Sequence, residues 1–240
     1  MITGGNSGIG LATAKLFQRE GAKVIITARS AETHRVALTE LGRHFDVVQT
    51  DVSKLSEIDS LVAHVKQKYG RIDVLFANAG IAEPLPFGQA TEESFDRQYG
   101  VNVKGLFFTV QKSLPLLENG SSVILNASVV ASKGFPGMSV YSGTKASVRN
   151  LARVLAVELA PRGIRVNVLS PGAIETPIWD KMGLDEKSKA EQTERLASTV
   201  PLARVGRPEE MANVALFLAS PDSSYINGAE ILADGGVGSI

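Results

Sequence analysis

The feature that most constrains this chain is a repeated alternation of short apolar segments with longer amphipathic ones. The apolar segments are rich in valine and isoleucine, which is typical of strands buried on both faces of a parallel sheet. This order predicts βαβ units and one doubly wound α/β domain. The strands are expected near 24–27, 45–48, 72–76, 122–125, 164–168 and 230–232, and the helices near 8–20, 32–41, 54–69, 92–117, 142–160 and 208–219.

Two segments depart from this alternation. Only residues 1–3 precede the first glycine pair, so the first strand looks shorter than the usual ~5–6 residues. Residues 177–205 follow the carboxyl end of a predicted strand and carry no strand pattern of their own. Ligands bind at that edge of open α/β sheets, so we expect residues 177–205 to form a substrate lid within the single domain 1–240.

The composition excludes several classes of function. Lys+Arg and Asp+Glu are balanced at 25 each, which leaves no electrostatic footprint for nucleic acid or for an anionic membrane. The absence of cysteine excludes disulfides and thiolate chemistry, and the histidines lack metal-ligand spacing, so no metal is expected. No apolar run is long enough to span a bilayer and the start does not read as a signal peptide, so a cytoplasmic protein is expected.

Residues 3–10 read Thr-Gly-Gly-Asn-Ser-Gly-Ile-Gly and precede a helical pattern. Glycines 4, 8 and 10 permit a tight turn and close approach of the backbone to a pyrophosphate, which the amides of a helix amino terminus can bind. An ordinary glycine-rich turn is the alternative, because the spacing is not G-x-G-x-x-G. The missing Gly-Lys-Ser/Thr ending disfavours a nucleoside-triphosphate site.

Residues 141–145 read Tyr-Ser-Gly-Thr-Lys at the start of a predicted helix. Their i,i+4 spacing places Tyr141 and Lys145 on one face, ~5–6 Å apart. A phenol has a pKa near ~10, and a cation at ~5 Å is expected to lower that pKa by about two units. Tyr141 would then work as a general acid/base near neutral pH, although the motif alone could arise by chance.

The glycine loop, Asn78-Ala79-Gly80 and the Tyr141/Lys145 pair together resemble the short-chain dehydrogenase/reductase family, in its single-domain branch. The resemblance extends from Thr3 to Asp234-Gly235-Gly236. It implies a Rossmann-type parallel sheet of about seven strands with helices on both faces, a nicotinamide dinucleotide and usually a homotetramer. The predicted helices 92–117 and 142–160 carry apolar residues on more than one face. This pattern is consistent with subunits that assemble through these helices, but a monomer whose core is well covered would show the same pattern.

The resemblance implies four catalytic residues: Asn102, Ser128, Tyr141 and Lys145. Tyr141 would give its proton to a carbonyl oxygen, and Lys145 would hold the nicotinamide ribose and modify the pKa of Tyr141. Ser128 would stabilise the substrate oxygen. Asn102 would hold a helix kink and a water that relays protons to Lys145. A capping serine and a buried asparagine that satisfies backbone groups are the alternatives for Ser128 and Asn102.

The same resemblance implies the cofactor contacts. Asp51 would contact adenine by its carboxylate and Val52 by its backbone, although Asp51 could instead belong to a helix N-cap region. The segment 171–176 matches the Pro-Gly segment beside the nicotinamide, with a plain turn as the alternative. The full set is Gly4, Asn6, Ser7, Gly8, Ile9, Gly10, Arg29, Asp51, Val52, Asn78, Ala79, Gly80, Tyr141, Lys145, Pro171, Gly172, Ile174 and Thr176.

Arg29 favours NADP(H) over NAD(H). The second predicted strand ends Thr27-Ala28-Arg29-Ser30, without the carboxylate that would bind the ribose hydroxyls and repel a 2′-phosphate. A guanidinium pairs with a phosphate bidentately. NAD(H) stays possible, because Arg29 could be an ordinary surface residue and Ser7 stands where many NADP-dependent relatives carry a second basic residue.

The substrate is the least constrained feature. An apolar pocket for a ketone with a hydrophobic substituent is expected, although each wall residue could equally be core or lid packing. The candidates are Ser128, Val130, Phe135, Met138, Trp179 and Met182. We expect an NADP(H)-dependent oxidoreductase that interconverts a ketone or aldehyde and a secondary alcohol.

Three alternatives stay open beside it. A 3-oxoacyl-[acyl-carrier-protein] reductase would use Arg162 for docking, although residues 118–120 offer it no partner. A glucose-type sugar 1-dehydrogenase of the same family is the second. The third is a non-catalytic NADP-sensing protein, which the intact catalytic set disfavours.

Overall fold

The computed structural model describes residues 1–41, 45–176 and 186–240. Six strands pair in parallel in two groups, β1 with β2 and then β3, β4, β5 and β6 in that order. Their bounds are β1 (Val24–Ala28), β2 (Phe45–Gln49), β3 (Ile72–Ala77), β4 (Leu117–Asn126), β5 (Arg165–Pro171) and β6 (Glu230–Ala233).

Residues 1–3 join the two groups into one sheet. Ile2 is bridged in parallel to Ile26 of β1 and to Phe76 of β3. The strand order is therefore β2, β1, residues 1–3, β3, β4, β5, β6, and the doubly wound Rossmann-type sheet is confirmed. Six strands and this bridged segment stand where about seven strands were expected.

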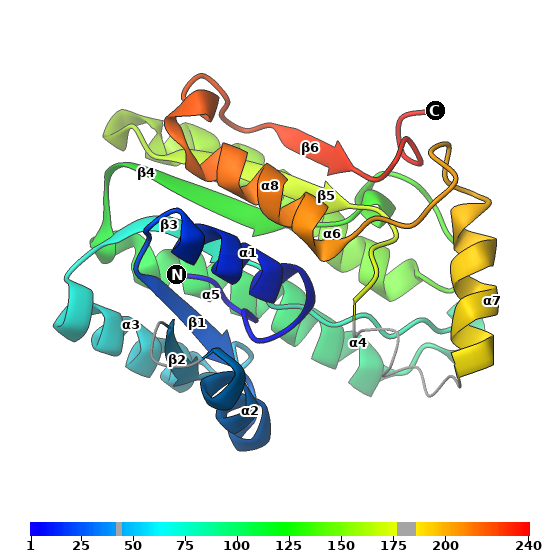
Figure 1. The fold of residues 1–240 in the computed structure, drawn as a ribbon, viewed down its shortest axis with the longest axis horizontal. Helices are drawn as coiled ribbons and strands as arrows, with labels where there is room; N and C mark the ends of the chain where they lie inside the picture. The colour runs from blue at the N-terminus through cyan, green and yellow to red at the C-terminus, as the bar shows by residue number, and fades with distance from the viewer. Residues whose placement is uncertain (42–44, 177–185) are drawn as a thin grey trace.

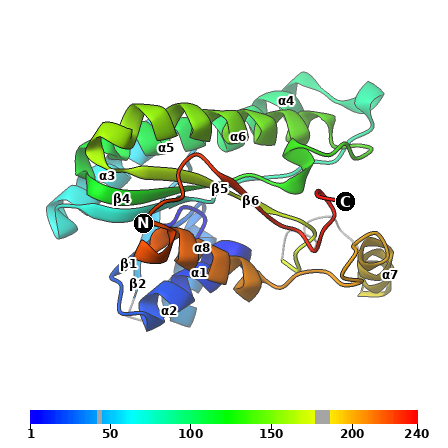
Figure 2. The same ribbon diagram turned by 90° about the horizontal axis from the view of Figure 1, so that it is seen from above.

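Helices cover both faces of the sheet (Figures 1 and 2). One face carries α1 (Gly8–Arg19), α2 (Ala31–Leu41) and α8 (Pro208–Ala219), and the other carries α3 (Leu55–Tyr69), α4 (Glu92–Tyr99), α5 (Leu106–Ser113) and α6 (Ser139–Leu159). In both views α7 (Glu186–Ala197) stands at the end of the molecule toward which the arrows of β4, β5 and β6 point. Among the described helices, none is long and apolar enough to cross a membrane.

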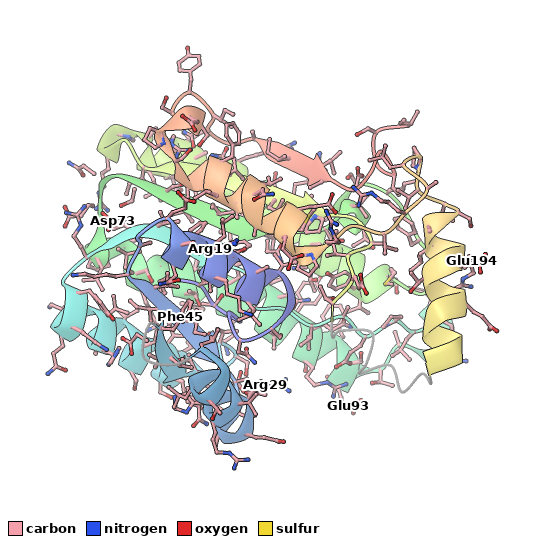
Figure 3. The ribbon with its side chains drawn as sticks, in the orientation of Figure 1. Arg19, Arg29, Phe45, Asp73, Glu93 and Glu194 are labelled. Carbon is pink, nitrogen blue, oxygen red and sulfur yellow. The ribbon has the colours of Figure 1, made fainter. Side chains whose placement is uncertain are left out.

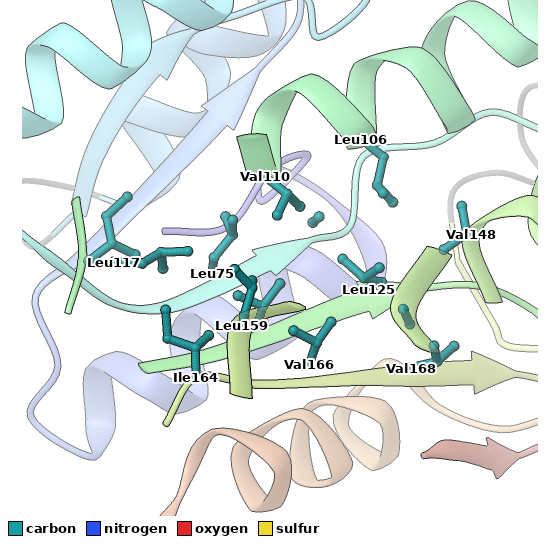
Figure 4. Close-up of a cluster of buried hydrophobic side chains, with 14 of the residues drawn as sticks. Leu75, Leu106, Val110, Leu117, Leu125, Val148, Leu159, Ile164, Val166 and Val168 are labelled. Carbon is teal, nitrogen blue, oxygen red and sulfur yellow. The ribbon is translucent and has the colours of Figure 1, made fainter. Parts of the chain in front are cut away.

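Apolar side chains from successive strand residues pack on opposite faces of the sheet. Val123 and Leu125 of β4 belong to the buried cluster under α5 and α6, which Figure 4 shows, whereas Ile124 belongs to the cluster under α1 and α8. Successive strand side chains point to opposite faces, so a strand covered on both sides is mostly apolar along its whole length. This explains the apolar runs in the sequence, and buried polar exceptions such as Asn167 and Ser170 of β5 are hydrogen-bonded.

The expectation of one helix over 92–117 was wrong. The segment contains α4, a π-helical turn at Gly100–Gly105, α5 and a 3₁₀ turn at Leu114–Leu116, and β4 already begins at Leu117. Asn102 in the π turn is fully buried and is bonded to the backbone of Ile81 through both polar atoms of its amide. The π turn thus holds Asn102 against Ile81, and such π bulges inside α-helices are frequent at functional sites.

The expected lid segment is described only in part. Residues 177–185, which include Trp179 and Met182, lie outside the described residues. Residues 186–197 form α7, and turns follow it as far as β-bridged Gly206. The role of 177–205 as a lid stays a prediction.

Candidate active site

The glycine loop is packed so closely that its glycines cannot carry side chains. Gly4 and Gly8 adopt φ values of +63° and +50°, which favour glycine. A Cβ on Gly10 would lie 2.4 Å from the carbonyl oxygen of Gly4 and 2.6 Å from Nδ2 of Asn78. Asn78 Nδ2 donates to the carbonyl oxygens of Thr3 and Gly4 at 3.0 and 3.2 Å, which locks the loop onto the segment after β3.

Asn78 therefore works as a clamp inside the protein. Thr3 Oγ1 accepts from the backbone N–H groups of Asn78 and Ala79 at 3.0 and 3.1 Å, and Asn126 Nδ2 donates to Asn78 Oδ1 at 3.0 Å. Sequence analysis missed Thr3 and Asn126 as parts of the site, because nothing in the local pattern shows that they meet. Oδ1 of Asn126 is buried without a hydrogen-bond partner among the described residues.

Tyr141 and Lys145 lie one turn apart on α6, as their spacing predicted. Lys145 Nζ lies over the Tyr141 ring, 5.6 Å from its centroid, and donates to the carbonyl oxygen of Asn126 at 2.7 Å. Lys145 is only 3% exposed, and this burial lowers the pKa of its amine to about 8. Removing an ammonium group from water disfavours its charged form.

The expected lowering of the Tyr141 pKa was wrong. Burial raises the pKa of the Tyr141 phenol to about 12, and a hydrogen bond with Ser128 opposes that rise only partly. The amine of Lys145, which lies over the ring, does not outweigh the loss of water around the hydroxyl. Tyr141 consequently keeps its proton at neutral pH, which suits a proton donor.

Ser128 follows the end of β4 and has two contacts. Its Oγ accepts from the N–H of Val130 at 3.4 Å, which caps the 3₁₀ turn Val129–Ala131. The same side chain lies beside the Tyr141 phenol and acts to lower the pKa of that phenol. This serine therefore caps a turn and lies beside the phenol, while its role in stabilising a substrate oxygen stays a prediction.

Asn102 lies close to Lys145 across Gly80. Its Oδ1 accepts from the N–H of Ile81 at 2.8 Å, and its Nδ2 donates to the carbonyl oxygen of Ile81 at 2.8 Å and to Thr144 Oγ1 at 3.1 Å. A Cβ on Gly80 would lie 3.2 Å from Asn102 Oδ1 and 3.4 Å from Lys145 Nζ. The asparagine satisfies backbone groups and lies in a helix irregularity beside the lysine, while a proton relay through it stays a prediction.

Asp51 and Val52 lie in the turn before α3. Oδ1 of Asp51 accepts from the backbone N–H and the hydroxyl of Ser53 at 3.0 and 2.7 Å, so the carboxylate helps to form this turn. Val52 is buried, and a Cβ on Gly105 would lie 2.7 Å from its carbonyl oxygen. The alternative of a helix-start role for Asp51 is thus supported, and adenine contacts from these two residues stay predictions.

The Pro-Gly segment continues from β5 along the end of β6. Pro171 is the last residue of β5, and the N–H of Gly172 donates to the carbonyl oxygen of Ala233 at 3.1 Å. Ile174 is buried and bridged to Gly206. Thr176 is the last described residue before the gap.

A cavity of about 420 Å³ lies between the glycine loop and the start of α2; it is lined by Asn6, Ser7, Gly8, Leu11, Glu32, Thr33 and Val36. Arg29 is exposed at the end of β1, outside this lining (Figure 3). Reciprocal bonds between Ser30 and Thr33, at 3.1 and 3.2 Å, fix the start of α2. The sequence pattern did not indicate Glu32, which lines the cavity.

These features fit a nicotinamide dinucleotide. The loop backbone of Gly4 and Gly8 has no side chain to hinder a pyrophosphate, and α1 begins at Gly8 with N–H groups that can bind the anion. The cavity beside them has room for a ribose. Ile9 packs against the core below the loop, so only its backbone is left for the predicted cofactor contact.

The expected substrate wall is only partly assembled from described residues. Val130 and Phe135 pack against Val129, Val200 and Val237, which supports the alternative that they are packing residues. Met138 is half-buried directly before α6.

Arg162 is half-buried and bonded within the protein, since it donates to the carbonyl oxygens of Leu114 and Leu117. A role for this residue in docking an acyl carrier stays a prediction.

Comparisons with known proteins agree with this geometry. The family model described as "Enoyl-(Acyl carrier protein) reductase" matches residues 4–238. The chain is 42% identical to the 3-oxoacyl-[acyl-carrier-protein] reductase FabG of Thermotoga maritima, covering 99% of this chain and 96% of the relative.

Two solved structures from Brucella melitensis share the fold. A short-chain dehydrogenase/reductase named as a glucose/ribitol dehydrogenase superposes with a TM-score of 0.91 at 33% identity, covering 98% of this chain and 94% of that one. A 3-ketoacyl-(acyl-carrier-protein) reductase complexed with NADH gives 0.90 at 34% identity, covering 99% and 96%. The chain therefore belongs to the short-chain dehydrogenase/reductase family.

Proposed function

We propose that this enzyme is an NADP(H)-dependent oxidoreductase that interconverts a ketone or aldehyde and a secondary alcohol. The observation that carries the proposal is the meeting of Ser128, Tyr141 and Lys145 where β4 ends and α6 begins. A protonated phenol beside a serine hydroxyl, with a buried amine behind the ring, is an arrangement that can bind a carbonyl oxygen and protonate it.

When bound, the nicotinamide supplies or accepts the hydride. The hydroxyls of Ser128 and Tyr141 hold the substrate carbonyl oxygen, and Tyr141 donates its proton to that oxygen as negative charge develops there. The ammonium of Lys145 stabilises the tyrosinate that is left. Because burial raises the pKa of Tyr141 to about 12, reduction begins with the proton in place, whereas alcohol oxidation requires its removal first.

Cofactor choice depends on two side chains of opposite charge at the start of α2. Arg29, exposed at the end of β1, supports NADP(H) because a guanidinium can pair with the 2′-phosphate. Glu32 lines the adjoining cavity and would repel the same phosphate. We propose that Arg29 dominates, because its guanidinium can form two charge-assisted hydrogen bonds, and that NAD(H) is the weaker alternative.

Reduction of a 3-oxoacyl thioester is the second candidate. It is favoured by the 42% identity to a protein named for that activity. The bonds of Arg162 to two backbone carbonyl oxygens weaken it, because they occupy part of the guanidinium that would meet an acidic carrier. A sugar 1-dehydrogenase is supported only by likeness to one structure named as a glucose/ribitol dehydrogenase.

We further propose a homotetramer, which the exposed apolar side chains of α5 and α6 support. Phe107, Val154 and Val157 are 40%, 46% and 76% exposed on the helical face opposite α1 and α8 (Figure 2). Burying such side chains against another copy is favourable. Light scattering on the purified protein measures the mass of the oligomer, and we expect Val157→Glu to lower that mass.

Initial rates of NADPH and NADH oxidation, measured in parallel, test the proposed reaction. The substrates are small ketones, aryl ketones and an acetoacetyl thioester. Preferred turnover of ketones with NADPH supports the proposal. A strong preference for the thioester selects the second candidate, and a preference for NADH shows that Glu32 outweighs Arg29.

A further inference from the structure

Thr144 lies inside the catalytic helix, directly before Lys145, and is fully buried. Its Oγ1 donates to the carbonyl oxygen of Tyr141 at 2.7 Å, a bond that helical threonines often form with the preceding turn. The same oxygen accepts from Asn102 Nδ2 at 3.1 Å. An amide nitrogen can only donate, so the hydroxyl proton must point to Tyr141, and both capacities of this hydroxyl are used in one orientation.

This hydroxyl connects α6 to a second part of the site. Asn102 belongs to the π turn and is itself held by the N–H and the carbonyl oxygen of Ile81. The chain of bonds therefore runs from Ile81 through Asn102 and Thr144 to Tyr141. Gly80 fills the space between Asn102 and Lys145, where even a Cβ would lie 3.4 Å from the lysine amine.

We propose that Thr144 is a positioning residue for the reaction, because its hydroxyl fixes the rotation and depth of α6 against the π turn. Tyr141 and Lys145 lie on either side of it on the same helical turn, so a shift of α6 moves the phenol and the amine together. The inference rests on the proposed function. Displacements of about 1 Å in a catalytic group can cost on the order of 100-fold in rate.

Two substitutions at position 144 distinguish the contribution of the hydroxyl from that of side-chain packing. Thr144→Val keeps the branched shape but leaves one N–H of Asn102 unpaired in the interior. Thr144→Ser keeps the hydroxyl. Thr109→Val is a matched control, since Thr109 is 1% exposed in α5 and donates to the carbonyl oxygen of Gly105 at 2.7 Å.

The kinetic test compares kcat, KM and the pH profile of kcat for the three variants and the wild type. We expect Thr144→Val to lower kcat by about 10- to 100-fold and to shift the pH profile, with KM for NADPH within about three-fold. Thr144→Ser should recover kcat to within about three-fold and restore the profile. Thr109→Val should keep the wild-type kcat and profile even where its melting temperature falls.

A second measurement does not depend on turnover. In protein labelled with ¹³C at tyrosine Cζ, the Tyr141 resonance is assigned by its loss in Tyr141→Phe. Thr144→Val should displace that resonance, whereas Thr144→Ser and Thr109→Val should leave it in place.

Each outcome decides the inference. A wild-type pH profile and an unmoved resonance in Thr144→Val overturn it, as does a loss of activity that merely parallels lost thermal stability in both valine variants. If the wild type reduces no carbonyl compound, the proposed function fails, and the resonance alone decides whether Thr144 positions Tyr141.

Discussion

The inner and outer parts of the candidate site use their polar side chains differently. In the inner part, between β3, β4 and α6, Asn78, Asn102 and Lys145 are bonded to other groups of the protein. In the outer part, beside the glycine loop and α2, Ser7, Arg29 and Glu32 are exposed. The inner groups therefore hold the catalytic frame in place, and the outer groups are available to a ligand.

This difference predicts where substitutions act. Changes in the inner part leave buried polar atoms without partners, which costs stability and rate. Changes in the outer part alter contacts in water, where charge pairs contribute little. We therefore expect effects to fall from the phenol of Tyr141 outward to Arg29 and Glu32.

The largest effect should come from Tyr141→Phe. Loss of the proton donor is expected to lower kcat by about 100- to 10,000-fold, the range for general acid catalysis. The NADPH dissociation constant, measured by fluorescence titration, should stay within a few-fold, because the ring remains. Retained turnover would exclude the role given to this phenol.

Lys145→Met should remove a pH dependence of stability. Burial lowers the pKa of the Lys145 amine from 10.5 to about 8, so between these values the unfolded chain binds more protons than the folded one. Wild-type stability should therefore gain on the order of 2 kcal/mol relative to Lys145→Met between pH 8 and pH 9.5. Urea unfolding at the two pH values measures it.

The comparison with Lys145→Met cancels the opposite contribution of Tyr141. Burial raises the pKa of that phenol from 10.0 to about 12, so as the pH rises the phenol loses its proton in the unfolded chain before it does in the folded one. This contribution lowers the stability of both proteins with rising pH. A stability difference that is equal at both pH values would show that Lys145 is not desolvated in solution.

Asn126→Ala should destabilise the chain by about 1–3 kcal/mol, because Asn78 Oδ1 loses the donor that now lies 3.0 Å away. The glycine loop depends on Asn78, so NADPH affinity should fall as well. Asn119→Ala is the control: this asparagine is exposed, and its loss should change stability by no more than about 0.5 kcal/mol. Equal effects of the two substitutions would contradict the clamp.

The smallest effects belong to the outer part. Arg29→Ala should lower the preference for NADPH over NADH by about ten-fold, and Glu32→Gln should raise it by a few-fold, since one charge each is removed from a solvent-exposed phosphate site. Ratios of kcat/KM for the two cofactors measure both. An unchanged ratio in Arg29→Ala would assign the choice to other residues.

The features that could be predicted from the sequence are those that depend on residues close together in the chain. The apolar strands, the glycine loop and the shared helix face of Tyr141 and Lys145 follow from periodicity and spacing, and the structure has them. Partners far apart in the chain were missed. Asn126 lies 48 residues from Asn78, and Thr144 lies 42 residues from Asn102.

The prediction of a lowered pKa for Tyr141 was wrong for a related reason. Spacing along α6 indicated a nearby cation, but burial depends on packing from the rest of the chain and outweighs it. Periodicity likewise did not predict the π turn, although the resemblance implied a helix kink at Asn102, because the backbone of Ile81 that pairs with Asn102 lies far away in the sequence.

The π turn also sets the phase between α4 and α5. Each residue of an α-helix advances it by about 100°, so removing one residue from Gly100–Gly105 would rotate α5 by that angle relative to α4. The buried Leu106 and Val110 would then turn out of the core while α4 kept Gln98 inside. Outside Asn102 and Gly105, whose contacts require these residue types, the chain should thus tolerate exchange of residue types in this turn better than any insertion or deletion, because its length fixes the phase.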